Sequence, residues 1–191
     1  GEGLRGRGWR AGQEVEFHVG DGAFRHYTPS GWDAVAGRFE VVFHLHGRGP
    51  GSVWASGLRV GDEAHAMGPG GRFGLVAGVR HVLVGDETAI GVCMAMRAGV
   101  ENASMCLLEV DDEVEVVRAL VPGATVVRRG AERGEALAAA LRATARAGDV
   151  LYLAGHAGTI QRLRKVWSGE LGLPRSAVRI KAYWADGRRG M

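Results

Sequence analysis

The chain has 191 residues, of which 46% are hydrophobic and 24% are charged, with a formal net charge of +3. This composition is typical of a globular protein and excludes a largely disordered one. No apolar run approaches the roughly 20 residues that a membrane-spanning helix needs, so we expect no membrane insertion. The arginines are scattered among acidic residues, which argues against a nucleic-acid-binding face.

The first part of the chain, residues 1–76, has the pattern of short β-strands between glycine-rich turns. Alternating side chains predict strands over Glu14–Val19 and Arg38–His46, with a weaker one over Asp62–Met67. Phe24–Tyr27 is also extended and leads into Pro29. Strands at this spacing predict an antiparallel barrel or sandwich without a long helix. A first domain over 1–76 follows from this pattern.

From residue 77 to 191 the pattern changes to strands that alternate with helices. Such alternation predicts a parallel sheet covered by helices on both faces, and therefore a second, α/β domain over 77–191. Ile160, Leu163, Val166 and Trp167 fall on one face of the last helix. The expected strands are 81–85, 104–110, 124–128, 149–155 and 177–184, and the expected helices are 87–99, 131–148 and 158–172.

Two strand-to-helix turns carry residues that suit a phosphate-bearing ligand. Gly85–Thr88 follows one predicted strand and Gly155–Thr159 follows another. Ligands of parallel sheets bind at the carboxyl ends of the strands, where helix N-termini attract phosphate. The same residue types also suit ordinary turns and helix caps. The Gly-x-Gly-x-x-Gly fingerprint of dinucleotide-binding domains does not follow the first strand.

The stretch "RHYT" in the first half combines an arginine with an aromatic ring. In an extended strand Arg25 and Tyr27 point to the same face, and Thr28 points to the other. An aromatic ring is a stacking plane and a guanidinium binds pyrophosphate, although a half-buried strand tyrosine is also common. The loop from His46 to Gly57, with one helical turn near Ser52, is either a phosphate cradle or a plain loop around a buried tryptophan.

The ordered set of these motifs resembles one family. "RHYTPS", "FHLHGRGPGSVWA" with "GDEAHAMGPGGRF", "VGDETAI", and "LAGHAGTIQRLRKVW" leading to "AYWADGRRG" are similar to the siderophore-interacting proteins of the ferredoxin–NADP reductase superfamily. The resemblance implies an FAD-binding antiparallel β-barrel followed by an α/β domain that binds NAD(P)H. It also implies an FAD-dependent NAD(P)H:ferric-siderophore reductase, with the ferric siderophore as a small-molecule substrate.

The resemblance also implies roles for individual residues. Arg25 would hold the FAD pyrophosphate, Tyr27 would stack on the isoalloxazine ring, and Thr28 would lie near flavin N5. The remaining cofactor-binding residues it implies are His44, His46, Gly47, Gly49, Pro50, Gly51, Ser52, Trp54, Gly85, Asp86, Glu87, Thr88, Gly155 and His156. The residues it implies for the siderophore are Lys181, Trp184, Arg188 and Arg189. No general base is implied, because the flavin carries the chemistry.

Three positions depart from the family pattern. Ser30 lies where the family often carries arginine, Asp186 lies where positive charge is often found, and His156 lies in place of the usual glutamate. Because basic residues attract anionic ferric siderophores, these changes leave room for a general flavin-dependent reductase with another acceptor, or for a non-catalytic FAD-binding module. The first barrel strand of the family is also expected upstream of residue 1.

Other candidate residues are assigned less specific roles. His44 and His46 share a strand face, but further ligands for a metal are missing, so we expect no metal site. Cys93 and Cys106 are expected to be buried thiols, and with no secretory signal a cytoplasmic monomer is expected. The acidic run Glu109–Glu115 is either a solvated loop or a contact for an adenosine ribose. The donor stays open between NADH and NADPH, since arginines at positions 128, 129 and 133 are available for a 2′-phosphate.

Overall fold

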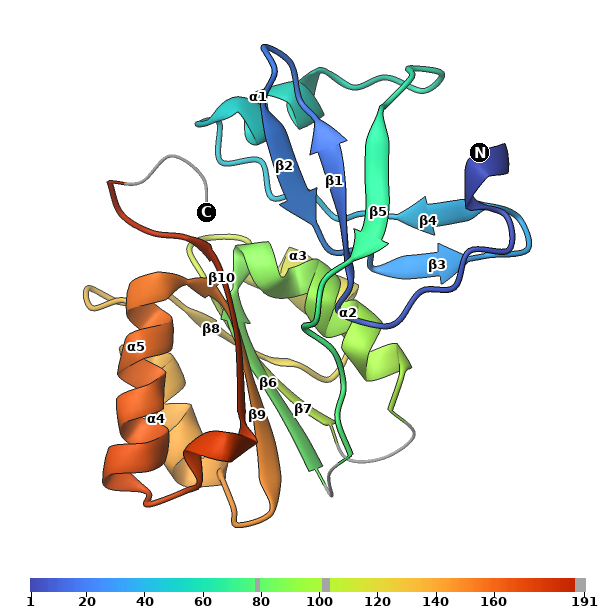
Figure 1. Ribbon diagram of the computed structural model, residues 1–191. Coiled ribbons are helices and arrows are strands. Elements are labelled where there is room, and N and C mark those ends of the chain that lie inside the picture. The colour runs from blue at the N-terminus through green and yellow to red at the C-terminus, as the bar shows by residue number, and fades with distance from the viewer. Residues whose placement is uncertain (78–79, 101–103, 188–191) are drawn as a thin grey trace.

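The computed structural model describes residues 1–77, 80–100 and 104–187 of the chain. Figure 1 shows two halves, one built from short antiparallel strands and one in which helices cover both faces of a parallel sheet. Among the helices of those three ranges, none has the length and apolar character that spanning a bilayer requires.

The N-terminal half contains two antiparallel sheets. Strand β1 (Glu14–His18) lies between β2 (Phe24–Tyr27) and β5 (Ala66–Gly70). Strands β3 (Gly31–Asp33) and β4 (Arg38–Glu40) pair in a short hairpin. The antiparallel arrangement predicted for this half is confirmed, with the described strands divided between two sheets and with β2 and β5 at the edges of the first.

The strand predicted over Arg38–His46 is too long. In the structure β4 ends at Glu40, because its partner β3 offers only three residues to pair with. The following residues Val41 and Phe43 are apolar because they pack against the core around Phe17. Burial without strand pairing therefore produced the extended apolar pattern.

Two further elements of this half differ from the prediction. The strand expected over Asp62–Met67 lies at Ala66–Gly70, because the ladder with β1 begins there and the residues before it are exposed. The single helical turn expected near Ser52 is a helix of 8 residues, α1 (Pro50–Gly57). Gly49, with φ of 80°, turns the chain into it, and proline suits the first helical position. A 3-10 turn, η1 (Glu2–Leu4), opens the chain.

The C-terminal half contains a parallel sheet in the order β10-β9-β6-β7-β8. All five predicted strands are confirmed to within two residues. They are β6 (Arg80–Asp86), β7 (Ser104–Val110), β8 (Thr125–Arg128), β9 (Asp149–His156) and β10 (Val178–Trp184). All eight residues of β9 are buried, as expected for a central strand covered on both faces.

Helices cover the two faces of this sheet. One face carries η2 (Glu87–Ala89), α2 (Ile90–Ala98) and α3 (Val114–Leu120). The other carries α4 (Glu135–Thr144), α5 (Ala157–Lys165) and the π-helical turn η3 (Val166–Glu170). A 3-10 turn, η4 (Arg175–Ala177), leads into β10.

The predicted helices are confirmed, with different boundaries. Helix α4 begins at Glu135 and not at residue 131, because Gly134 has φ of 81° and cannot continue a helix. The apolar face predicted for the last helix is confirmed, since all four of its residues are buried. Trp167 is 0% exposed, and its indole N–H donates to the Pro174 carbonyl at 3.0 Å. Helix α3 was not predicted.

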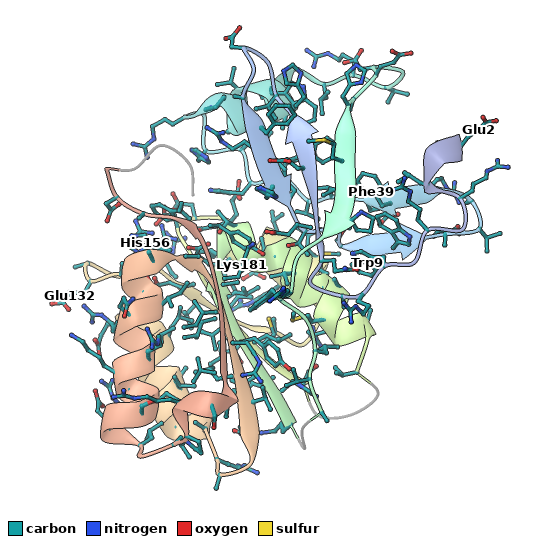
Figure 2. The ribbon with its side chains drawn as sticks, in the orientation of Figure 1. Glu2, Trp9, Phe39, Glu132, His156 and Lys181 are labelled. Atoms are coloured by element: carbon teal, nitrogen blue, oxygen red, sulfur yellow. The ribbon has the colours of Figure 1, made fainter. Side chains whose placement is uncertain are left out.

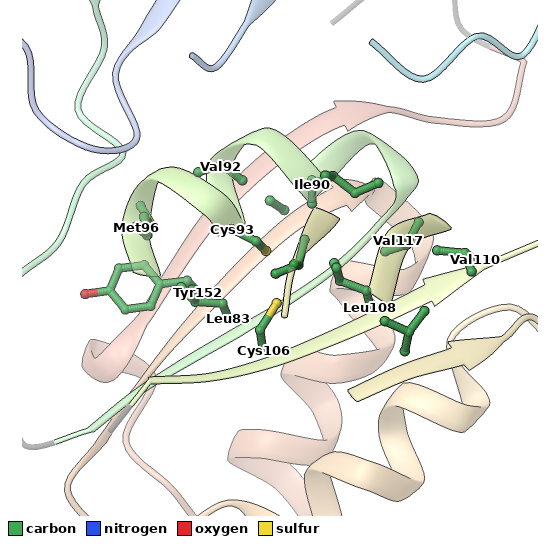
Figure 3. Close-up of a cluster of buried hydrophobic side chains, with 14 of the residues drawn as sticks. Leu83, Ile90, Val92, Cys93, Met96, Cys106, Leu108, Val110, Val117 and Tyr152 are labelled. Atoms are coloured by element: carbon green, nitrogen blue, oxygen red, sulfur yellow. The ribbon is translucent and has the colours of Figure 1, made fainter. Parts of the chain in front are cut away.

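The core under α2 and α3 contains both cysteines (Figure 3). Cys93 from α2 and Cys106 from β7 are free and 2% exposed. A hydrogen bond with Cys106, together with burial, raises the pKa of Cys93 well above its ordinary value. The prediction of buried thiols is confirmed.

Candidate functional site

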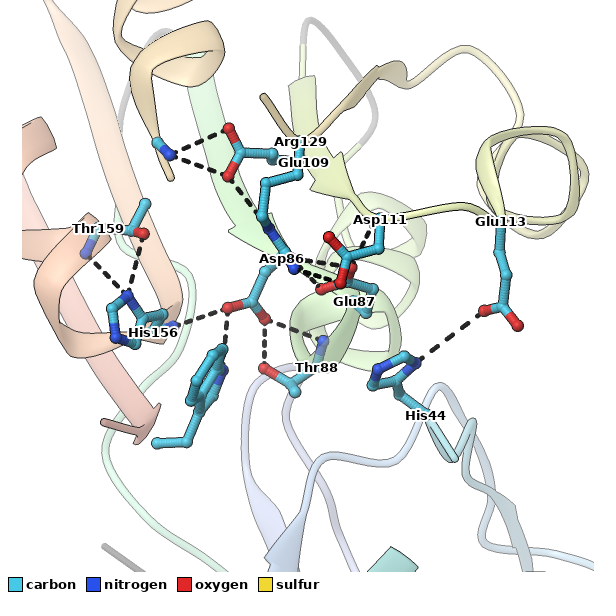
Figure 4. Close-up of polar contacts among 12 residues, drawn as sticks. His44, Asp86, Glu87, Thr88, Glu109, Asp111, Glu113, Arg129, His156 and Thr159 are labelled. Atoms are coloured by element: carbon cyan, nitrogen blue, oxygen red, sulfur yellow. Dashed lines mark hydrogen bonds and ion pairs between the residues drawn. The ribbon is translucent and has the colours of Figure 1, made fainter. Parts of the chain in front are cut away.

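The carboxylate of Asp86 joins the carboxyl ends of three strands (Figure 4). Its Oδ1 accepts from the Thr88 amide at 3.0 Å and from the Thr88 hydroxyl at 2.5 Å. Its Oδ2 accepts from the His156 amide at 2.8 Å and from the Trp184 indole N–H at 3.0 Å. Gly155 allows this arrangement, because a Cβ there would lie 2.6 Å from the carboxylate. Asp86 therefore positions its neighbours through its side chain.

His156 begins helix α5 and lies next to Trp184. Its Nδ1 accepts from the Thr159 amide at 3.3 Å, and its Nε2 lies 3.2 Å from Asp186 Oδ2. The imidazole and the indole ring have centroids 4.4 Å apart. The histidine therefore acts as a helix cap and packs on Trp184 at the ends of β9 and β10. Parallel sheets bind their ligands in a crevice outside these carboxyl ends.

A buried ionic cluster lies beside Asp86, at the ends of β6 and β7 (Figure 4). Arg129 contacts Glu87 at 2.6 Å, Asp111 at 2.7 Å and Glu109 at 3.5 Å. Both oxygens of Glu109 accept from the Gly134 amide. Burial alone lowers the pKa of Arg129, but the Glu87 and Asp111 carboxylates raise it above its ordinary value. The guanidinium is thus committed to three carboxylates.

The acidic run Glu109–Glu115 is not a solvated loop throughout. Glu109 is the penultimate residue of β7 and is 1% exposed, and burial raises its pKa. Helix α3 begins at Val114, within the run. Asp111 and Asp112 between them are exposed, and Asp112 pairs with Arg128 at 3.0 Å. The run therefore combines a buried structural acid, an exposed turn and a helix start.

In the N-terminal half, Arg25 and Tyr27 share one face of β2, as the alternation predicts. Both side chains flank Gly51 of α1, where a Cβ would lie 2.3 Å from the Tyr27 hydroxyl and 3.3 Å from Arg25 Cγ. The Tyr27 ring meets Phe43 edge-on at 4.7 Å, and burial raises the pKa of its hydroxyl. The Arg25 guanidinium donates to the carbonyl of its neighbour Phe24 at 2.6 Å.

The loop before α1 closes around the same place. The Ser52 hydroxyl accepts from the Gly47 amide at 3.0 Å. Trp54 packs on Phe17, with ring centroids 5.3 Å apart. His44 and His46 lie outside any strand, with ring centroids 5.8 Å apart, and His44 is 4.0 Å from Glu113. No cluster that could hold a metal occurs in the described residues.

The two halves meet through polar contacts between the first strands and β10. The hydroxyls of Thr28 and Tyr183 lie 2.9 Å apart, and burial raises the pKa of Tyr183. A Cβ on Gly91 of α2 would lie 2.8 Å from the Thr28 carbonyl oxygen, which shows how closely the backbones approach. Lys181 donates to Glu14 at 2.5 Å (Lys181 is labelled in Figure 2).

The residues assigned to the siderophore fall in different environments. Lys181 forms the ion pair with Glu14, and Trp184 lies in the crevice wall on Asp86. Arg188 and Arg189 lie outside the described residues. A cavity of about 370 Å³ lies elsewhere, at the amino end of β10, and its lining includes Arg164, Lys165 and Arg175. It is therefore separate from the crevice at the carboxyl ends of the strands.

The predicted cofactor residues thus form two groups on either side of one junction. The first surrounds Gly51 and the second surrounds Asp86, and Thr28 reaches the junction from the first half. The Arg129 cluster and the contacts of Tyr183 were not predicted. An acidic residue at a strand end with threonine two positions later, as in Asp86 and Thr88, is a sequence pattern that indicates helix capping.

The arrangement around Gly51 fits a large phosphate-bearing cofactor such as FAD. The glycine removes the side chain that would block Tyr27, and Arg25 holds only a local carbonyl among the described residues. The N-terminus of α1 faces the same loop, and its free amides suit phosphate oxygens. The residues present therefore match the chemistry of the group.

Comparison with known proteins covers both halves. The sequence profile of the family described as "Siderophore-interacting protein" matches residues 79–187, and that of the "Siderophore-interacting FAD-binding domain" matches residues 8–73. No curated protein matches the chain.

Similar solved structures agree with this fold. The siderophore-interacting protein from "Acinetbacter baumannii" has a TM-score of 0.76 at 21% identity, with 94% of this chain and 79% of that chain covered. SipS, the siderophore-interacting protein from Aeromonas hydrophila, has a TM-score of 0.78 at 22% identity, with 94% and 81% covered. Phthalate dioxygenase reductase has a TM-score of 0.78 at 15% identity, with 98% and 62% covered.

The two profiles follow one another along the chain and together leave few residues unmatched. The fold is that of the ferredoxin reductases, and its first half matches an FAD-binding domain. The chain belongs to the siderophore-interacting protein family, and its first half is the FAD-binding domain of that family.

Proposed function

We propose that this protein is an NAD(P)H:ferric-siderophore reductase, which frees iron by reducing chelated Fe(III) to Fe(II). One observation carries the proposal. Arg25 and Tyr27 flank Gly51 on one face of β2. The next residue, Thr28, contacts the Tyr183 hydroxyl at the end of the parallel sheet. A cofactor held in the first half therefore lies beside a donor held in the second.

The first half supplies binding and orientation in this proposal. Arg25 holds the FAD pyrophosphate with its planar guanidinium, and the backbone amides of the Gly49–Ser52 turn bind further phosphate oxygens. Tyr27, supported edge-on by Phe43, presents its ring to the flavin. Thr28 offers a hydroxyl near flavin N5. FAD held by these residues would supply the redox chemistry, which is hydride acceptance from NAD(P)H and one-electron transfer to the acceptor.

The second half holds the donor. Gly85 and Gly155, at the ends of adjacent strands, let the nicotinamide half come close to the backbone. Asp86 holds Trp184 and the His156 amide in place with its carboxylate, so the wall of the crevice is rigid before the donor arrives. Hydride and electron transfer require no proton donor from the protein, so we assign no general acid or base.

A second candidate is a flavin-dependent reductase with a different acceptor. Two observations favour it. Ser30 is 9% exposed, and its amide donates to the Glu40 carbonyl, so it offers no positive charge to an anionic substrate. Asp186 pairs with His156 at 3.2 Å, so negative charge lies at the edge of the crevice. Lys181 and Trp184 remain the proposed contacts for a siderophore.

The visible absorption spectrum tests the proposal. The purified protein is expected to show flavin bands that bleach when NADH or NADPH is added without oxygen. Reoxidation by a ferric siderophore in preference to ferricyanide or a quinone supports the siderophore as acceptor, and the reverse preference supports the second candidate. Bands that persist after both donors indicate a binding module, and a protein that takes up no FAD refutes both proposals.

A further inference from the structure

Arg133 lies in the loop between β8 and α4, next to Trp184 at the carboxyl end of β10. Its guanidinium carbon is 4.7 Å from the centroid of the Trp184 ring. Its Nη1 is buried and has no hydrogen-bond partner within the described residues. Buried N–H groups are nearly always paired, so an unpaired one in a crevice indicates a ligand that brings the acceptor.

The tryptophan beneath Arg133 is held firmly. Its indole N–H donates to Asp86, and its ring packs on His156. Trp184 is the last residue of β10, Asp86 is the last residue of β6, and His156 is the last residue of β9. The sheet order reverses between β6 and β9, which is where parallel sheets of this kind bind their ligands. Arg133 therefore lies above the expected ligand position.

The two arginines before it, Arg128 at the end of β8 and Arg129 in the loop, are already ion-paired. Arg128 pairs with Asp112 at 3.0 Å, and Arg129 pairs with Glu87 at 2.6 Å. No ion pair of Arg133 occurs within ranges 1–77, 80–100 and 104–187. Of the three arginines, Arg133 is thus the one available to an anion.

The carboxylates near Arg133 have partners of their own. Glu109 accepts from the Gly134 amide with both oxygens, Asp86 accepts from three residues, and Asp186 pairs with His156. The negative charge of these carboxylates repels anions, so the general electrostatic potential of this region does not attract them. An anion held here must therefore depend on directed N–H bonds from one guanidinium, so removal of that guanidinium has a large effect.

We propose that Arg133, held over the Trp184 ring, binds a phosphate of the pyridine dinucleotide. The inference rests on the proposed function, because it takes NAD(P)H as the ligand of this crevice. A guanidinium presents two parallel N–H groups to a phosphate, and the indole ring keeps that fork in one orientation. The phosphate is either in the pyrophosphate bridge, which NADH and NADPH share, or at the 2′ position, which only NADPH has.

Calorimetric titration of the flavin-loaded protein with NAD⁺ and with NADP⁺ tests the inference. Arg133→Ala removes charge-assisted hydrogen bonds, so we expect Kd to rise about tenfold or more for the nucleotide whose phosphate it binds. An equal rise for both nucleotides places Arg133 on the pyrophosphate, and a rise for NADP⁺ alone places it on the 2′-phosphate. Arg133→Lys keeps the charge without the planar fork and is expected to weaken binding less.

Arg164→Ala is the matched control, because it removes an exposed arginine of α5 far from the crevice. It is expected to leave both dissociation constants unchanged. Unchanged affinity in both Arg133 variants, or a wild-type protein that binds neither nucleotide, overturns the inference. If binding depends on Arg133 but neither donor bleaches the flavin, the proposed function fails and the phosphate site stands.

Discussion

The two halves of the molecule are stabilised in different ways. In the α/β half, two clusters of buried apolar side chains lie on opposite faces of the sheet, and its central strand is wholly buried. In the β half, the buried core is Val15, Phe17 and Val19, extended by half-buried aromatic rings. Residues of β2 alternate between exposed and half-buried, and those of β5 are mostly exposed.

This difference shows where stability and binding are located. The α/β half has a core large enough to support its own strands. The β half contacts that half through the side chains of Thr28 and Glu14 and through the Thr28 backbone, which lies close to Gly91. A ligand that binds only the folded state adds stability by an amount set by its concentration and Kd, and that amount is a larger share of the total where the core is small. The β half is therefore expected to depend on FAD for much of its stability.

The largest effect is expected in the α/β half, from loss of the Arg129 cluster. Arg129→Met leaves the buried Glu87 and Glu109 carboxylates without their cation, and breaking a buried pair costs about 3–5 kcal/mol in the free energy of unfolding. Urea unfolding followed by circular dichroism measures this loss. Arg128→Met removes an exposed pair and is expected to cost at most about 1 kcal/mol. Similar losses for the two variants would show that the cluster is not structural.

The next effect tests the β half through the contact between β2 and α1. Gly51→Ala places a methyl group 2.3 Å from the Tyr27 hydroxyl, so the ring must move. Overpacking of this kind costs about 1–3 kcal/mol, and we expect FAD affinity to fall because Tyr27 and Arg25 are displaced together. Fluorescence titration with FAD measures the change in Kd.

Gly57→Ala is the control for this variant. It lies in the same helix, and a Cβ there meets nothing within 4 Å. We expect wild-type affinity for FAD, since the substitution leaves Tyr27 in place. Equal weakening in the two variants would show that α1 as a whole, and not the fit at Gly51, controls the affinity.

A smaller effect measures how strongly the halves are joined. Thr28→Val and Tyr183→Phe each remove one hydroxyl of the pair at 2.9 Å. A double-mutant cycle on urea unfolding is expected to give a coupling energy of about 1 kcal/mol, the usual contribution of one hydrogen bond. Additive losses would mean that the hydroxyls do not interact, and that the halves are joined mainly by packing and by Lys181–Glu14.

The smallest effect is a pH dependence that belongs to the α/β half. Burial lowers the pKa of His81, whose Nδ1 lies 3.2 Å from the Tyr152 hydroxyl. The folded state therefore favours the neutral ring, and the unfolded chain takes up a proton first as the pH falls. This stability is present above the ordinary pKa of about 6.5 and declines below it, by at most about 1.4 kcal/mol per pH unit. Urea midpoints in acidic and neutral buffer are expected to differ less in His81→Gln.

Hydrophobic patterning was enough to predict most elements of the α/β half. Leu83 faces the α2 side and Val84 faces the α4 side, so both faces of β6 are apolar. The strand therefore appears in the sequence as a short continuous apolar run, which is typical of a buried parallel strand. Alternation also placed Arg25 and Tyr27 on one face of β2. The β half was predicted less well, because exposed residues such as Asp62 carry no burial signal and three-residue strands are too short to show a period.

The local elements, the order of the two halves and the family motifs could be predicted from the sequence, because they depend on neighbouring residues. The partners of each polar side chain depend instead on how distant segments pack together. Trp184 donates to Asp86 across 98 positions, and Thr28 meets Tyr183 across 155. Such pairs form only when separate strands end at one edge, and no local spacing encodes them. The same packing gave Arg129 its carboxylate partners and left Nη1 of Arg133 buried without a hydrogen-bond partner among the described residues.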